Sequence, residues 1–355
     1  MKPRQTVARR WVTLGGLAAL ALGAFGAGEA QAASVEDLYR GKTLTILLGH
    51  PPGGSYDLYG QLAAAHMGRF IPGNPNIIVQ HMPGGGGSKG AAHYMANVEA
   101  DGMTIALLPD TMAHVQLLRP KRGKWDSSKI RYIGRFAPTN SAFAIHRDAA
   151  AKTIEDLKTV QTTAGCTGKS SRSAQMPALL KNLAGMNLKL ICGYKGSSAA
   201  TLAVLKREVD MVNKAWPAFK SGNAAELQSG ELVIILQSGL ERDPDLPNVP
   251  LLQEIVDDPK AKEIMEFSSA AAPIGRSLMT KEGVPADVLA ALRAAFQEMV
   301  VDEEFLADAK RRKADIIPAS GEDMEKILAK ILSASPELVK SAKAAMDTSS
   351  AASTN

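Results

Sequence analysis

Residues 43–57 read TLTILLGHPPGGSYD and give the first indication of the fold. The apolar and β-branched run from Thr43 to Leu48 has the length of a buried strand. The Pro-Pro-Gly-Gly sequence that follows predicts a turn. Residues 55–70 then have the composition of a helix, with Ser55 as its candidate N-cap. A strand, a glycine-rich turn and a helix in this order are typical of an α/β protein.

The same order of elements repeats along the chain. Strands are predicted at 76–80 and 103–108, with a helix at 89–97 between them. A second series of short strands and helices covers 142–237. Strand–helix–strand units of this kind form parallel sheets with right-handed crossovers. The sequence therefore predicts an α/β fold with two parallel-sheet lobes.

Beyond a proline-rich connection at 243–252, the chain is predicted to be almost wholly helical. We expect lobe one at 33–138, lobe two at 139–265, a mostly helical return to lobe one at 266–346 and a disordered tail at 347–355. Ligands bind beyond the carboxyl ends of the strands in open parallel sheets. The two lobes are therefore expected to face each other across a ligand-binding cleft between domains.

The first 32 residues are predicted to be a secretory signal peptide. Residues 1–10 carry four cations and no carboxylate, residues 11–28 are apolar and small, and Ala30-Gln31-Ala32 has the A-x-A form of a cleavage site. One alternative is a membrane anchor, for which the apolar stretch is barely long enough. Another is twin-arginine export through Arg9-Arg10. Cleavage lowers the formal net charge from +5 to +2, so we expect a periplasmic protein with no nucleic-acid partner.

Four loops that follow predicted strands are rich in glycine, serine and threonine. They cover 49–56, 82–90, 165–173 and 193–198. Together they hold no carboxylate and four cations, which are Lys89, Lys169, Arg172 and Lys195. Glycines let successive N–H groups converge, and a helix N-terminus adds partial positive charge. Any one loop is more simply explained as an ordinary strand-to-helix turn, but the shared bias of all four predicts a carboxylate or phosphate ligand.

Two of these loops resemble nucleotide-binding motifs. Residues 85–90, GGGSKG, fit G-x-G-x-x-G between a predicted strand and a helix, but a four-glycine run satisfies many patterns by chance. Residues 163–170, TAGCTGKS, have Thr163 where a P-loop requires glycine. Nucleotides are scarce outside the inner membrane. We therefore expect anion-binding turns and no cofactor.

Histidine and serine give little support for metal binding or catalysis. His50 and His81 end two predicted strands of lobe one, but a metal site needs a third ligand, and polar residues at the cleft rim are the simpler interpretation. No serine pairs locally with a histidine, so we do not expect an enzyme. Trp216 follows a predicted strand near the turn toward the hinge, and it is either hinge core or cleft wall.

Cys166 and Cys192 are the only cysteines in the sequence. Each ends a predicted strand, and one helix joins the two strands. Adjacent parallel strands lie about 4.8 Å apart, which is within reach of a disulfide. An oxidising compartment favours the bond. The alternative is a pair of reduced, buried cysteines.

Six short motifs occur in an order and spacing typical of one family. They are PGGSYD at 52–57, PGNP at 72–75, MPGGGG at 82–87, GYKG at 193–196, EVD at 208–210 and LPNVP at 246–250. On these motifs the chain, from about Leu38 to Lys343, resembles the extracytoplasmic solute-binding receptors of tripartite tricarboxylate transporters, the TctC and Bug receptors. The resemblance implies a two-lobed type II periplasmic binding fold that closes on its ligand.

The resemblance also implies where the ligand lies. The two lobe-one loops hold one end of an organic acid, partly through water, and a helix start in lobe two grips a carboxylate. Asp57 matches a family aspartate that caps or orients its loop. Together with Trp216, the candidate ligand-binding residues are His50, Pro52, Gly53, Gly54, Ser55, Tyr56, Asp57, Gly85, Gly86, Gly87, Ser88, Thr167, Gly168, Lys169, Ser170, Ser171, Tyr194 and Lys195.

The sequence departs from the family at four positions that bear on the ligand. His81 replaces a usual asparagine, His50 replaces an apolar or aromatic residue, and Lys169 and Arg172 add charge. These departures leave the identity of the carboxylate open. We expect a monomeric receptor that captures a small dicarboxylate, tricarboxylate or aromatic acid and presents it to a membrane permease. A periplasmic sensor and an exported enzyme on the same scaffold are the alternatives.

Overall fold

A computed structural model describes residues 34–169 and 171–348 of the chain. The predicted signal peptide, Ser170 and residues 349–355 of the predicted tail lie outside the described residues. Two sheets belong to one compact unit that begins at Ser34. In this part of the chain, none of the helices has the length and apolar character needed to cross a membrane.

The first sheet has the strand order β11-β4-β10-β3-β1-β2. Its strands are β1 (Thr43–Leu48), β2 (Asn76–His81), β3 (Thr104–Leu107), β4 (Ile130–Ala137), β10 (Arg276–Lys281) and β11 (Ala319–Ser320). As predicted, β1 pairs in parallel with β2 and β3. The strand β10 instead runs antiparallel to both β3 and β4, so the sheet is mixed.

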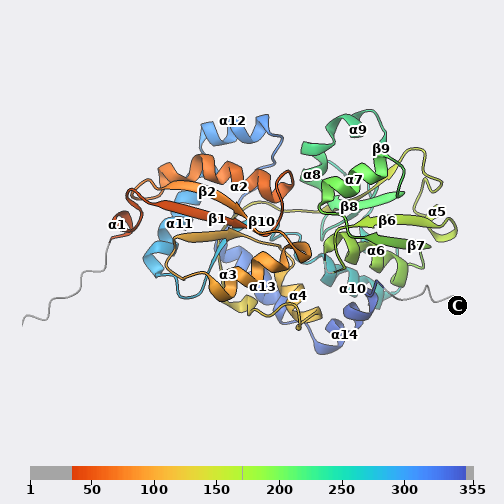
Figure 1. Cartoon of the computed structure of the whole chain (residues 1–355). Coiled ribbons are helices and arrows are strands. Elements are labelled where there is room, and N and C mark those ends of the chain that lie inside the picture. The colour runs from red at the N-terminus through yellow and green to blue at the C-terminus, as the bar shows by residue number, and fades with distance from the viewer. Residues whose placement is uncertain (1–33, 170, 349–355) are drawn as a thin grey trace, which may run out of the picture. The chain divides into compact units, whose positions relative to one another are not determined.

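Helices and short 3₁₀ turns accompany the first sheet (Figure 1). They are α1 (Val35–Tyr39), α2 (Ser55–His66), η1 (Met67–Phe70), η2 (Gly85–Gly87), α3 (Ser88–Asn97), α4 (Met112–Leu118), η3 (Ser127–Lys129), α11 (Ala286–Met299), α12 (Glu303–Arg311) and α13 (Gly321–Leu332). The N-cap of α2 is Gly54 rather than the predicted Ser55, because Gly54 has the extended backbone of a cap and Ser55 is already the first helical residue; the Ser55 hydroxyl accepts a bond from Arg276 Nε.

The second sheet has the strand order β7-β6-β8-β5-β9. Its strands are β5 (Ser141–His146), β6 (Thr162–Cys166), β7 (Leu188–Cys192), β8 (Met211–Ala215) and β9 (Leu232–Ser238). The strands β7, β6 and β8 are parallel, whereas β5 is antiparallel to β8 and β9. The accompanying helices are α5 (Asp156–Thr159), α6 (Arg172–Leu183), α7 (Ser197–Leu205), α8 (Trp216–Gly222), α9 (Ala224–Gln228), η4 (Leu252–Glu254), α10 (Pro259–Ser269) and α14 (Pro336–Ala345).

The prediction of an almost wholly helical C-terminal part was wrong at β10. Its sequence, RSLMTK, has a cation at each end and no alternation of apolar and polar residues. Leu278 and Met279 are fully buried because β10 lies between β3 and β4 in the sheet. Placement in the sheet, rather than the local pattern, makes this segment a strand.

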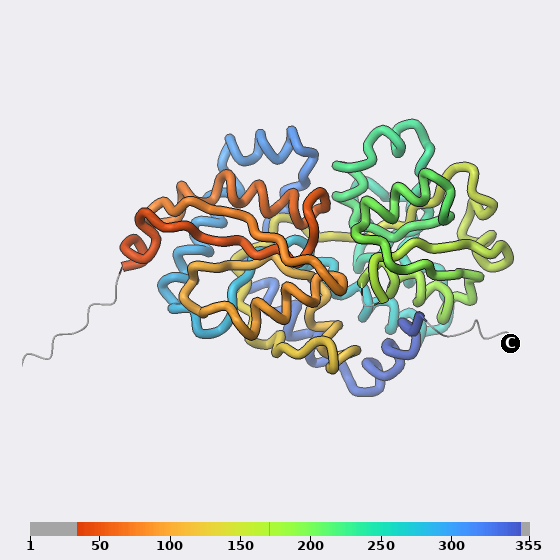
Figure 2. The backbone as a smooth tube through the Cα atoms, in the orientation of Figure 1, coloured from red at the N-terminus to blue at the C-terminus, as the bar shows by residue number. Residues whose placement is uncertain are grey.

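The chain crosses between the two sheets at residues 138–140 and again at residues 270–275, a path that can be followed in Figure 2. The Thr139 N–H donates to the Ala272 carbonyl oxygen at 2.8 Å, which ties the two crossings together. Gly275, at the end of the second crossing, has a φ of +53°. A Cβ built there would lie 2.0 Å from the Ala137 carbonyl oxygen. The crossing therefore requires glycine at this position.

We predict that Gly275→Ala lowers the free energy of unfolding by about 3 kcal/mol, since it combines a left-handed backbone with a backbone clash. Gly41→Ala is the matched control, because Gly41 has a φ of +69° but no atom within 4 Å of a built Cβ. The control should lose only about 1 kcal/mol. Chemical denaturation measures both values, and equal losses would contradict the steric argument.

Candidate ligand-binding site

A cavity of about 520 Å³ lies at the carboxyl ends of strands from both sheets. Most of the sequence-predicted site residues line it. They are His50, Pro52, Gly54, Ser55, Tyr56, Gly85, Gly86, Gly87, Thr167, Ser171, Tyr194 and Lys195. The loops after β1, β2, β6 and β7, which the sequence singled out, therefore meet around one space.

Other predicted site residues do not line this cavity. They are Gly53, Asp57, Ser88, Gly168, Lys169 and Trp216, while Ser170 lies outside the described residues. The Trp216 side chain is buried, and its indole N–H donates to an Asp245 carboxylate oxygen at 3.2 Å. Trp216 lies directly after β8, as the first residue of α8, and lines a different groove.

Asp57 holds the loop after β1 in shape. Its carboxylate accepts the Gly53 N–H at 2.9 Å and the His81 Nε2–H at 2.8 Å. Burial by itself would raise the pKa of Asp57, but these hydrogen bonds outweigh burial and keep the pKa below its ordinary value. The same bond joins the loop to the end of β2. His81 is therefore a partner of Asp57, and it does not line the cavity that His50 lines.

The glycine run after β2 brings the backbone of one lobe to the other. Gly84 to Gly87 all have positive φ angles. A Cβ built on Gly86 would lie 3.1 Å from the Cβ of Ser171. The neighbouring loops also meet, since the Ser198 hydroxyl donates to the Gly53 carbonyl oxygen at 3.5 Å. Side chains in the glycine run would hold the two rims of the cavity apart.

A stack of three side chains forms one wall of the cavity. The His50 and Tyr56 rings are parallel, with centroids 3.9 Å apart. The Arg276 guanidinium also lies 3.9 Å from the Tyr56 centroid. It must occupy the opposite face, since both groups at that distance on one face would collide. Burial and the Arg276 charge lower the pKa of His50 to about 3, so His50 is a neutral part of the wall.

Asp110 is the one carboxylate among the described residues that line the cavity. Arg172 Nη2 donates to its Oδ2 at 2.7 Å, and Arg276 Nη1 lies 3.7 Å from the same atom. The Asp110 backbone N–H donates to the Tyr56 hydroxyl at 3.1 Å. All three charged side chains are largely buried. Asp110 is therefore committed to the two arginines and is not a free acidic group.

Four cations line the cavity, namely Arg172, Lys195, Lys214 and Arg276. Burial lowers the pKa of Lys214 to about 8, and its ammonium donates to the Asn223 side-chain oxygen at 2.6 Å. A buried cation of this kind gains from an anion nearby. With a single carboxylate opposing four cations, the wall favours an anionic ligand.

Sequence reasoning found only part of this charge. Arg172 and Lys195 were noted as loop cations, whereas Lys89 and Lys169 do not line the cavity. Arg276 was missed because β10 was not predicted. Asp110 and Lys214 were missed because neither lies in one of the glycine-rich loops. Asp110 closely follows the predicted strand at 103–108 and Lys214 is the penultimate residue of β8, so their places near strand ends were signals that could have identified both.

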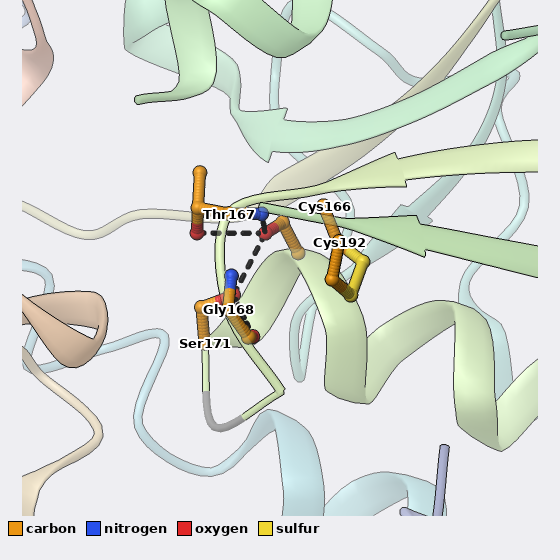
Figure 3. Close-up of a disulfide and its surroundings, with 6 residues drawn as sticks. Cys166, Thr167, Gly168, Ser171 and Cys192 are labelled. Carbon is orange, nitrogen blue, oxygen red and sulfur yellow. Dashed lines mark hydrogen bonds between the residues drawn. A yellow bond between two sulfur atoms is a disulfide. The ribbon is translucent and has the colours of Figure 1, made fainter. Parts of the chain in front are cut away.

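Side-chain hydroxyl groups hydrogen-bond to the backbone of the loop after β6 and stabilise its conformation, as Figure 3 shows. The Ser171 hydroxyl donates to the Gly168 carbonyl oxygen at 2.7 Å, and the Thr167 N–H donates to the Ser173 hydroxyl at 3.1 Å. Ser171 is the N-cap of α6. The loop therefore ends at a helix N-terminus that faces the cavity, where partial positive charge favours an anion.

Cys166 and Cys192 form a disulfide directly before two of the site loops (Figure 3). They are register partners in the parallel pair β6 and β7. Thr167 follows one cysteine, and Gly193 and Tyr194 follow the other. The bond therefore fixes the starting points of both loops relative to each other.

Among the described residues, the one group with the geometry to hold a metal lies outside this cavity. It consists of His66, Asp302 and Glu304. The Arg69 guanidinium bonds to both carboxylates, and His66 Nε2 lies 3.1 Å from an Asp308 oxygen. These groups form an ion-pair network that already has a cation, so they do not fit a metal ion.

Two sheet-containing lobes with a cavity at their strand ends define a two-lobed periplasmic binding protein. The periplasmic binding protein BugD has the same fold, with a TM-score of 0.69 at 19% identity, over 86% of this chain and 98% of that one. MatC from Rhodopseudomonas palustris with bound malate has a TM-score of 0.66 at 18% identity, and the match covers 87% of this chain and 100% of that one. Rpa4515 from R. palustris with adipate has a TM-score of 0.66 at 18% identity, and the match covers 85% of this chain and 97% of that one.

The chain belongs to the TctC family, described as tripartite tricarboxylate transporter family receptor, which matches residues 65–343. This confirms the predicted resemblance and the fold class. The chain is thus a solute-binding receptor of the periplasmic binding protein type. No curated protein matches the chain.

We predict that His50→Phe makes the stability less dependent on pH. The unfolded histidine has an ordinary pKa near 6.5, whereas the folded value is about 3, so the unfolded chain binds the extra proton and stability falls as the pH drops below 6.5. Wild-type protein should lose up to about 1.4 kcal/mol per pH unit from this residue. Phenylalanine keeps the stack on Tyr56 but cannot titrate.

Denaturation at pH 7, 5.5 and 4.5 measures this dependence. His114→Phe is a comparison, since burial also lowers the pKa of His114 to about 4 and His114 does not line the cavity. Each variant should lower proton uptake on unfolding by about one. An unchanged pH slope in His50→Phe would show that His50 is protonated in the folded protein.

We predict that Cys166→Ser with Cys192→Ser lowers the free energy of unfolding by about 3 kcal/mol, since the bond closes a loop with a sequence separation of 26. Solute affinity should also fall, because both cysteines adjoin site loops. Thiol titration of the denatured wild type should find free thiols only after reduction. Two thiols without reductant would contradict the bond.

Proposed function

We propose that this receptor captures a small organic carboxylate in the cavity and delivers it to the permease of a tripartite tricarboxylate-type transporter. The observation that carries the proposal is the charge of the cavity wall. Among the described residues, four cations line it, and the one carboxylate, Asp110, is already bound by Arg172 and Arg276. Charge-assisted hydrogen bonds to a ligand carboxylate are strong in such a partly enclosed space.

The shape of the cavity supports a small ligand. A volume of about 520 Å³ accommodates an organic acid together with bridging water. The wall comes from both lobes, so a ligand that bonds to Tyr194 or Lys195 on one side and the glycine run on the other stabilises their approach. The relatives with malate and adipate bind acids of this class.

Delivery to a permease is supported by the family description, tripartite tricarboxylate transporter family receptor, rather than by the cavity itself. The proposal places the receptor in the periplasm, exported through the predicted signal peptide at residues 1–32. The receptor's part is binding and release, with no bond made or broken in the ligand. A monomer is sufficient for this role, because both lobes belong to one chain.

Isothermal titration calorimetry with malate, succinate, adipate and citrate tests the proposal. At least one acid should bind, and its neutral diamide or triamide should bind at least a hundredfold more weakly because it lacks charge. Product analysis of the same mixture should return the acid unchanged. Failure of every organic acid to bind would end the carboxylate proposal, and product formation would favour an enzyme.

We predict that Lys195→Ala weakens binding of the identified acid about tenfold, which corresponds to about 1.4 kcal/mol. Lys169→Ala is the matched control, because both lysines are exposed in site loops but only Lys195 lines the cavity. The control should bind within twofold of wild type. A larger loss from Lys169→Ala than from Lys195→Ala would place the ligand elsewhere in the loop after β6.

A further inference from the structure

A second groove, of about 680 Å³, lies between the two sheet-containing lobes and is separate from the ligand cavity. One wall comes from α12 and residues 313–316, and the other comes from α8 and α9. In Figure 1 these helices lie on the same side of the described unit, at the top of the view. A molecule that fills the groove contacts elements of both sheets at once.

The floor of this groove is apolar. Trp216, Ala309 and Ala314 line it and are each less than a tenth exposed. Leu306, which also lines the groove, is 39% exposed, whereas its neighbour Phe305 is fully buried. Exposed apolar surface inside a concave, polar-rimmed groove is typical of a docking surface.

The rim of the groove is cationic for a specific reason. Residues 310–313 read KRRK. Arg311 and Arg312 both donate to the buried Asp308 Oδ1, so the fold already holds both guanidinium groups. Lys310 and Lys313 line the groove, are exposed, and have no carboxylate partner within the described residues. The run therefore divides into two arginines held by the fold and two lysines left for a partner.

Lys220 lies in the same groove but is already neutralised. Its ammonium lies 2.5 Å from Asp245 and 2.5 Å from Asp315. Burial alone would lower the pKa of Lys220, but the two carboxylates outweigh it and raise the value. The pair with Asp315 joins α8 to the residues after α12, across the groove. The shape of the groove therefore depends on the positions of the two lobes relative to each other, which this ion pair helps to fix.

The backbone at Lys313 adds an independent observation. Lys313 has a φ of +55° and lies just after the C-cap of α12, Arg312. Glycine is the usual residue at this position, because a left-handed conformation is strained for residues with a Cβ. Residues other than glycine that are held in such a strained backbone conformation cluster at functional positions. Here that residue is Lys313, one of the two lysines without a carboxylate partner.

We propose that this groove docks an acidic segment of the membrane permease, with carboxylates against Lys310 and Lys313 and an apolar side chain on the floor beside Trp216 and Leu306. The inference rests on the proposed function, which supplies the permease as partner. Complementary charge fixes the register and speeds association, and the apolar floor contributes the burial. Because the walls of the groove belong to both lobes, the affinity for the permease segment depends on the positions of the lobes relative to each other.

The double variant Lys310→Glu with Lys313→Glu tests the docking site. The full receptor is assayed by calorimetry with the identified acid and by uptake of that labelled acid into proteoliposomes that contain the membrane permease subunits. Solute affinity should stay within twofold of wild type, and uptake should fall at least tenfold. Unchanged uptake at unchanged solute affinity would overturn the inference.

Lys340→Glu with Lys343→Glu is the matched control. These two lysines have the same spacing, are exposed on α14, and do not line the groove. The control has the same change of net charge and should support wild-type uptake. An equal loss from the control would show a general effect of charge and would also overturn the inference.

A second variant, Lys313→Gly, separates docking from folding. Glycine relieves the left-handed strain, so the melting temperature should rise by about 2 °C. Uptake should nevertheless fall severalfold, because one rim charge is lost. A rise in both stability and uptake would show that the lysine has no part in docking.

Vesicles of phosphatidylglycerol without permease test a lipid as the occupant. Wild type and the double variant should sediment equally with these vesicles. Sedimentation that depends on Lys310 and Lys313 would overturn the inference in favour of a membrane surface. Failure of the wild type to bind any organic acid is seen in calorimetry alone, and it would count against the proposed function rather than against the groove.

Discussion

The ion network of Asp110, Arg172 and Arg276 is the interaction on which the rest of the site depends. Asp110 follows β3, Arg276 begins β10 and Arg172 begins α6, so the network joins three elements and both sheets. Each charge is largely buried, and a buried charge without a partner is strongly destabilising. The network therefore fixes where the lobes meet while leaving guanidinium groups in the wall of the cavity.

The same two lobes produce two spaces of different character. The ligand cavity is lined by glycine loops, hydroxyl groups and cations, and polar groups there are ordered by hydrogen bonds such as that between Ser171 and Gly168. The groove beside α12 has an apolar floor with lysines at its rim. Ion pairs between the lobes lie at both, with Arg172–Asp110 at the cavity and Lys220–Asp315 at the groove. A change in lobe arrangement would therefore affect both spaces together.

The site could be predicted where its chemistry is local in sequence. The loops after β1 and β2 carry Pro-Gly-Gly and a four-glycine run, which predict turns at strand ends wherever the strands lie in the sheet. Asp57 was placed in the right loop, but the sequence did not show that it bonds to Gly53 and His81. Arg276 lies 221 residues along the chain from its hydrogen-bond partner Ser55, so no local sequence pattern relates them.

The sequence by itself determined the alternation of strands and helices, the loops that follow the strands, and their bias toward cations, because each depends on residues that are neighbours along the chain. Only the tertiary structure decided which cations share a wall. Lys169 and Lys195 both lie in glycine-rich loops and look alike in sequence, yet only Lys195 lines the cavity. The antiparallel strand β10 and the pairing of Asp110 were also decided by tertiary contacts, because burial and electrostatic partnership depend on the positions of segments that are distant in sequence.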